Sequence, residues 1–160
     1  MIETGKIWMN GKLVPFKDAK VHVLTHALHY STSIFEGIRA YWNGENLHVF
    51  RLEEHVKRFR KSGQFYNISL NFTDSEIANA VIGICKKNKI KKSCYIRPFY
   101  FVGDYGISLH VTEKSPTNVA IFHFRLEIYL IKMELLQQLY LGENSQITLH
   151  LHKQKWVEII

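Results

Sequence analysis

Two arginines occur in settings where a guanidinium could bind an anion. Arg97 lies within the apolar segment CYIRPFYF, where an unpaired charge would be costly to bury. Tyr95 comes two residues earlier, so on a strand both side chains lie on one face and present a hydroxyl beside a fork of N–H donors. The pair suits a carboxylate ligand. The same pattern is also compatible with an ion pair between Arg97 and an acidic residue of the chain.

The second arginine, Arg58, follows Glu54 by four residues in a segment with helical spacing of apolar residues. One interpretation is a surface ion pair between the two side chains. The other is a clamp for a phosphate or carboxylate, which a planar guanidinium binds through two parallel hydrogen bonds. Gly37, in the segment FEGIR, indicates either the close approach of a ligand or backbone, or a bulge where a strand begins.

Histidines and lysines form two further groups. His22, His26 and His29 have a spacing that would place them on one face of a helix. No carboxylate or cysteine has a matching position nearby, so we expect structural histidines and no metal site. The basic run KKNKIKK, residues 86–92, lacks interleaved aromatics, and we interpret it as a solvated helix end without nucleic-acid binding.

The elements that must position these residues follow from apolar periodicity and turn signals. Asn-Gly pairs between apolar runs predict hairpins, helical spacing and a Thr-x-x-Glu capping box predict two helices, and β-branched and aromatic runs predict strands. The expected order is a hairpin over 7–16, a hairpin over 37–51, helices over 52–66 and 76–88, and strands over 93–103 and 118–124. This order favours an α+β fold with two helices and a mainly antiparallel sheet.

The composition is that of a globular protein: 46% of the 160 residues are hydrophobic and 22% are charged, with a net charge of +7. No apolar run approaches the roughly 20 residues of a membrane span, and the start lacks the pattern of a signal peptide. We therefore expect a cytoplasmic protein that has no membrane partner. Cys85 and Cys94 match no metal or redox spacing and are expected to be reduced thiols.

Four segments carry a specific resemblance: HALHYSTSIFEGIRAY, VFRLEEHVKRF, YIRPFYFVGDYG and NVAIFHF. Together they resemble the N-terminal domain of branched-chain amino acid aminotransferases, which are pyridoxal 5'-phosphate (PLP) enzymes of fold type IV. The resemblance covers roughly residues 4–124. D-amino acid transaminase and aminodeoxychorismate lyase share the fold but not this combination of motifs. Ser31 departs from the family, which usually has glycine after HALHY.

The resemblance implies an enzyme that transfers the amino group of leucine, isoleucine or valine to 2-oxoglutarate, and it implies a homo-oligomer. It also implies roles for individual residues. By this resemblance Arg58 binds the cofactor phosphate, and Tyr30 and Phe35 line the apolar substrate pocket. Gly37, Tyr95 and Arg97 help to bind the substrate carboxylates.

Residues 125–160 match nothing that follows in the family, where a motif similar to AKVGGNY carries the lysine that binds the cofactor covalently. The stretch KQKWVEII, read one base out of phase with suitable codons, gives AKVGGNY, and LLQQLYLGE likewise gives IATTISWG. We therefore expect residues 1–124 to form the aminotransferase domain and residues 125–160 to be a poorly structured, out-of-frame tail.

Lys155 aligns with the covalent lysine only by coincidence of codons, so it is no more than a fallback for the catalytic residue. On this interpretation the chain is a truncated enzyme that is inactive alone. The alternatives are a non-enzymatic fragment that dimerises and another fold type IV PLP enzyme.

Overall fold

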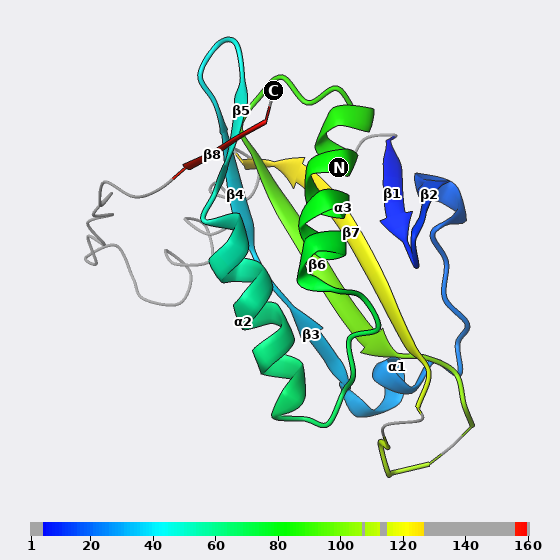
Figure 1. Ribbon diagram of the computed structural model, residues 1–160. Coiled ribbons are helices and arrows are strands. Elements are labelled where there is room, and N and C mark those ends of the chain that lie inside the picture. Colours follow the sequence, from blue (N-terminus) through cyan, green and yellow to red (C-terminus); the bar gives the residue numbers. More distant parts are fainter. Residues whose placement is uncertain (1–4, 107, 113–114, 127–155, 160) are drawn as a thin grey trace, which may run out of the picture.

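The computed structural model describes residues 5–106, 108–112, 115–126 and 156–159, and its strands form one antiparallel sheet with two long helices against one face (Figure 1). The elements in chain order are β1 Lys6–Met9, β2 Lys12–Pro15, the 3-10 helix η1 Phe16–Asp18, α1 His26–Tyr30, β3 Ser33–Phe35, β4 Ile38–Trp42, β5 Leu47–Phe50, α2 Leu52–Gln64, α3 Asp74–Lys87, β6 Cys94–Val102, β7 Thr117–Arg125 and β8 Trp156–Ile159. The expected α+β class is confirmed.

The strand order in the sheet is β2-β1-β7-β6-β4-β5-β8, with β3 also paired to β6. The two Asn-Gly signals both mark hairpins, as expected. Asn10 and Gly11 have φ values of 48° and 85°, which is the left-handed geometry that a tight hairpin requires. In the second hairpin the connection is longer, and Asn43 Oδ1 accepts hydrogen bonds from the backbone N–H groups of Glu45 and Asn46.

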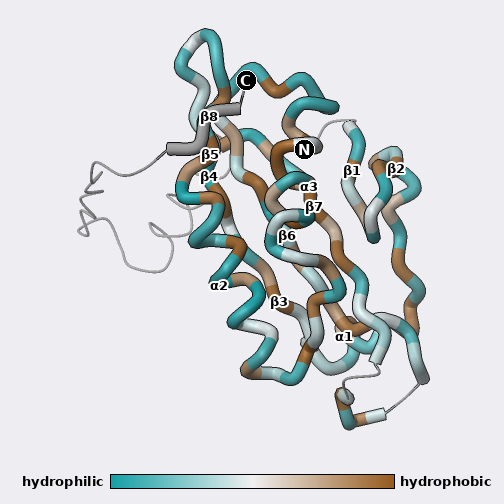
Figure 2. Tube along the Cα trace, viewed as in Figure 1, coloured by the Kyte–Doolittle hydropathy of each residue, from teal (hydrophilic) through white to brown (hydrophobic). Residues whose placement is uncertain are grey.

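Helices α2 and α3 cover the sheet with the apolar faces that their spacing predicts. The capping box is formed at the start of α3, where Thr73 Oγ1 accepts from the backbone N–H of Glu76 and Glu76 Oε2 accepts from that of Thr73. The core between helices and sheet is built from Val56, Phe59, Ile77, Val81, Ile84, Ile96, Tyr100, Val119 and Ile121. Figure 2 shows hydrophobic colour along the central strands and hydrophilic colour at the tip of the β4–β5 hairpin.

Strands β3 and β4 run along β6 in one unbroken register. Phe35 is opposite Phe99 and Ile38 is opposite Ile96, so two residues separate the paired positions on both strands. The bulge that we considered at Gly37 is therefore wrong, because a bulge requires an extra residue on one strand.

The structure differs from the sequence expectation by the short helix α1 and the short strand β3, which have too few residues for a periodic pattern to reveal. Of the tail, only Leu126 and Trp156–Ile159 are among the described residues beyond β7, and the latter form β8, paired with β5. The boundary at residue 124 and the weak packing of the tail stay predictions. Within the described residues, no helix is long and apolar enough to cross a membrane.

Candidate active site

Three consecutive residues at the junction of β3 and β4 organise the site. Phe35, Glu36 and Gly37 lie opposite the middle of β6, and the backbone N–H of Glu36 donates to the carbonyl of Pro98 at 2.9 Å. Each of the three meets a different partner. The phenyl ring contacts Arg97, the carboxylate binds a helix side chain, and the glycine contacts a tyrosine hydroxyl.

Tyr95 and Arg97 lie on one face of β6, as their spacing predicts. Arg97 Nη2 donates to Tyr95 Oη at 3.1 Å, and its guanidinium carbon stands 4.3 Å from the centroid of the Phe35 ring. Gly37 makes this arrangement possible, since a Cβ there would lie 1.7 Å from Tyr95 Oη. The close neighbour that the glycine admits is thus the hydroxyl of Tyr95.

Arg97 has no ion pair with an acidic residue in the described part of the chain, so the ion-pair interpretation is not supported there. Its Nε is buried and has no hydrogen-bond partner among the described residues. A buried donor of a charged group without a partner is costly, and a bound carboxylate would satisfy it. The geometry therefore fits an anion beside an apolar ring.

Arg58 makes a different contact from the surface pair that its spacing suggested. Its Nε and Nη2 donate to the two carboxylate oxygens of Glu36 at 2.6 and 2.7 Å, whereas Glu54 pairs with Arg51. The interpretation of Arg58 as the partner of Glu54 in a surface ion pair is therefore wrong. The register of β3 and β4 places Glu36 beside α2, which no spacing along the helix could reveal. His55 Nδ1 lies 2.9 Å from Glu36 Oε2 and completes the cluster.

The contact between Glu36 and Arg58 shifts the pKa of both groups. Burial alone would raise the pKa of Glu36, but the hydrogen bonds from Arg58 and His55 outweigh it and lower the pKa to about 2. The hydrogen bond to Glu36 in turn raises the pKa of Arg58. Glu36 is therefore ionised at neutral pH, and His55 Nδ1 must carry a hydrogen to donate to it.

The donor set of Arg58 fits a phosphate. Glu36 occupies the edge of the guanidinium formed by Nε and Nη2, and Nη1 has no hydrogen-bond partner among the described residues. The Arg58 side chain is 65% exposed, so this second edge is open to a ligand. An oriented, permanently charged fork is the group that proteins use most effectively for phosphate.

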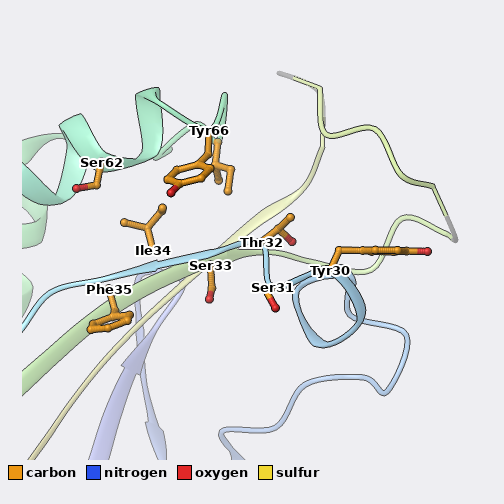
Figure 3. A pocket seen from close by; sticks show the side chains of 9 residues that line it. Tyr30, Ser31, Thr32, Ser33, Ile34, Phe35, Ser62 and Tyr66 are labelled. Carbon is orange, nitrogen blue, oxygen red and sulfur yellow. The ribbon is translucent and has the colours of Figure 1, made fainter.

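Tyr30 and Phe35 line a common pocket of about 530 Å³, which also includes Ser33, Ile34, Ser62 and Tyr66. Figure 3 shows Ile34 pointing toward Ser62 and Tyr66, while Phe35 and Ser33 lie on the other side of the strand. The volume is within the range of small-molecule sites. Phe35 thus joins the pocket to the Arg97 cluster, and the two groups of predicted residues meet at this ring.

The three histidines have separate hydrogen-bond partners. His26 is buried, with ring nitrogens 2.8 Å from Thr32 Oγ1 and 2.7 Å from the carbonyl oxygen of Ser108. His29 Nε2 lies 3.0 Å from the Val23 carbonyl oxygen, and His22 Nδ1 accepts from the backbone N–H of Leu24 at 3.2 Å. In the described residues no group of three or more potential ligands is placed to hold a metal.

Two other predicted positions have different outcomes. Ser31 ends α1 with φ 56°, a left-handed conformation in which glycine is favoured, so its departure from the family pattern falls at a strained turn. Lys155 lies outside the described residues.

Glu36 and His55 are site residues that the sequence patterns did not predict. The one available signal was an acid between apolar positions of a strand.

Comparison with known proteins gives a consistent result. The family model for amino-transferase class IV matches residues 33–148 of the chain. The branched-chain-amino-acid aminotransferase of Salmonella typhimurium is 43% identical over 124 residues, which is 78% of this chain and 40% of that protein. The chain therefore spans about 40% of the length of the curated relative it matches.

Solved structures show the same likeness. The branched-chain aminotransferase of Thermoproteus uzoniensis with norvaline has a TM-score of 0.74 and 40% identity, over 77% of this chain and 41% of that one. The T.th. branched-chain amino acid aminotransferase complexed with N-(5'-phosphopyridoxyl)-L-glutamate has a TM-score of 0.74 and 39% identity, over 80% and 43%. The expected type of fold is thereby confirmed.

Proposed function

Because the chain belongs to the class IV amino-transferase family, we propose that it carries the amino-terminal domain of a branched-chain amino acid aminotransferase. The reaction is transfer of the amino group of leucine, isoleucine or valine to 2-oxoglutarate. The relatives and structures named above are all branched-chain aminotransferases. This favours the proposal over D-amino acid transaminase, aminodeoxychorismate lyase or a non-enzymatic dimerising fragment.

The observation that carries the proposal is the Arg97 guanidinium beside the Phe35 ring. The enzyme must bind both an aliphatic side chain and the distal carboxylate of glutamate in one pocket. An apolar wall with one buried, unsatisfied N–H donor meets both needs. Arg97 and Tyr95 would hold the carboxylate, and Phe35 and Tyr30 would bound the space for the aliphatic chain.

The cofactor of the proposed enzyme is PLP, and Arg58 would hold its phosphate through the guanidinium edge that Glu36 leaves open. PLP supplies an electron sink for the carbanion that amino transfer requires. The residues of this chain would contribute binding and orientation. Arg58 on α2 would bind the phosphate, and Tyr95 and Arg97 on β6 would bind the substrate carboxylate. The intact enzyme is proposed to be a cytoplasmic homo-oligomer.

A chimera tests the proposal. Residues 1–124 would replace the matching part of the Salmonella typhimurium relative, and transamination of leucine, isoleucine and valine with 2-oxoglutarate would be measured. We expect activity, and we expect Arg97→Lys to raise KM for 2-oxoglutarate far more than KM for leucine, because lysine lacks the planar fork. A folded, PLP-loaded chimera that transaminates none of the three amino acids would refute the proposal.

For the 160 residues alone we expect no stable PLP absorbance above 400 nm and no transamination, because the site residues described above include no lysine. Lys155 is the one candidate named for covalent attachment. Borohydride treatment in the presence of PLP, followed by peptide mass mapping, tests it. A modified peptide that contains Lys155 would contradict the expectation.

We further propose that residues 125–160 are encoded out of frame. The curated relative aligns over 124 residues, whereas the family model extends its match to residue 148. Sequencing the coding DNA around the codons of Phe124 and Arg125 decides the matter. If no reading frame restores a motif similar to AKVGGNY, the tail is the chain's own sequence and the proposal fails.

A further inference from the structure

Glu36 connects the sheet to helix α2. Its backbone N–H is hydrogen-bonded to Pro98 on β6, and its carboxylate is only 5% exposed. The backbone that carries the carboxylate is thus fixed by its contact with the sheet, whereas Arg58 and His55 are carried by helix α2. A side chain bound to Glu36 is therefore tied to the same frame as Tyr95 and Arg97.

Both oxygens of this carboxylate are used. Oε1 accepts from Arg58 Nε at 2.6 Å, and Oε2 accepts from Arg58 Nη2 at 2.7 Å and from His55 Nδ1 at 2.9 Å. The 3.3 Å between Arg58 Nη2 and His55 Nδ1 is a contact between two donors that share one acceptor. The His55 side chain is 15% exposed, so its contact with the carboxylate is largely shielded from bulk water.

The consequence for Arg58 is orientation. An arginine that is 65% exposed ordinarily samples many rotamers, and ordering it on binding reduces affinity. Here the bidentate contact fixes the plane of the guanidinium and leaves the Nη1 edge for a ligand. We propose that Glu36, itself held by His55, is a positioning residue that presents Arg58 to the phosphate group of the cofactor. This inference rests on the proposed role of Arg58.

A rival explanation makes the opposite prediction. Glu36 is an anion close to a site for an anion, so Coulomb repulsion alone would weaken phosphate binding. If charge decided the affinity, Glu36→Gln would bind phosphate more tightly and Glu36→Asp would bind it unchanged. If position decides, both variants bind phosphate more weakly, since glutamine directs an N–H toward donors and aspartate is one methylene too short.

The experiment is an NMR titration of the full 160-residue chain with inorganic phosphate. The Nε–H resonance of Arg58 reports side-chain order before ligand is added, and its shift on titration reports affinity. The variants are Glu36→Gln, Glu36→Asp and Arg58→Ala. Glu54→Gln is the matched control, because it also removes one negative charge. Glu54 lies on α2 and pairs with Arg51. Backbone amide spectra show which variants keep the fold.

We expect a slowly exchanging Arg58 Nε–H in the parent chain and in Glu54→Gln, and its loss or rapid exchange in both Glu36 variants. Phosphate affinity should fall about tenfold in Glu36→Gln and several-fold in Glu36→Asp. An unchanged or higher affinity in folded Glu36 variants, with affinity lost in Arg58→Ala, would overturn the inference alone. An unchanged affinity in Arg58→Ala, or no phosphate binding by the parent, would overturn the role of Arg58 and the inference with it.

Discussion

Replacing Glu36 with glutamine should change how the stability of the domain depends on pH. The ionised carboxylate is 5% exposed and accepts hydrogen bonds from Arg58 and His55, which lower its pKa from 4.5 to about 2. Glutamine has nearly the shape of the protonated acid. The variant therefore approximates the parent protein after Glu36 has taken up a proton.

The magnitude follows from the shift in pKa. A shift of the Glu36 pKa from 4.5 to about 2 corresponds to about 3 kcal/mol, because one pKa unit is worth about 1.4 kcal/mol. Arg58 is largely exposed and solvent screens part of its charge, so we expect Glu36→Gln to lower the free energy of unfolding by about 2–3 kcal/mol at pH 7.

The stability should depend on pH in the direction set by a group whose pKa is lower in the folded state than in the unfolded state. Above pH 4.5 the carboxylate is ionised in folded and unfolded chains, and the stabilisation is fully present. Between pH 4.5 and about 2 only the unfolded chain takes up the proton, so the stabilisation falls by about 1.4 kcal/mol per pH unit. Below pH 2 the parent and the variant should be equally stable.

Urea unfolding followed by circular dichroism, at half-unit steps from pH 7 to pH 2, measures this difference. Glu54→Gln is the control, and its stability should run nearly parallel to that of the parent. Curves for Glu36→Gln and parent that stay parallel down to pH 2 would refute the reasoning. They would show that the Glu36 carboxylate has the same pKa in the folded and unfolded chains.

Three further substitutions test the packing and the site. Gly63→Ala should lower the free energy of unfolding by about 1–3 kcal/mol in urea despite better helix propensity, because its Cβ would lie 1.5 Å from Tyr100 Oη; the loss should shrink in a Tyr100→Phe background. Gly37→Ala should displace the Tyr95 hydroxyl and raise KM for 2-oxoglutarate about tenfold in the chimera. Ser31→Gly should raise the free energy of unfolding by about 0.5–1 kcal/mol in urea, since the left-handed strain at φ 56° is removed.

Local signals in the sequence were sufficient for most of the fold. A capping box, Asn-Gly turns and apolar periodicity act over a few residues, so both long helices, both hairpins and the two long strands could be predicted. The pairing of Tyr95 with Arg97 was also predictable, because a strand places residues two apart on one face. The short helix α1 was missed, since five residues are too few for a period.

The partners of the charged groups could not be predicted in this way. Spacing on the helix pointed Arg58 to Glu54, but the tertiary structure pairs it with Glu36 from the sheet. Contacts between residues distant in the sequence depend on strand register and on how a helix packs, and the local spacing of residues determines neither.

The sequence by itself therefore determined the helices and strands, the family resemblance and which residues could bind an anion. Only the tertiary structure decided that Phe35, Glu36 and Gly37 contact Arg97, Arg58 and Tyr95 in turn. The physical reason is the unbroken register of β3 and β4 against β6. It aligns three neighbouring residues with two strand side chains and one helix side chain, and so joins the three contacts into one site.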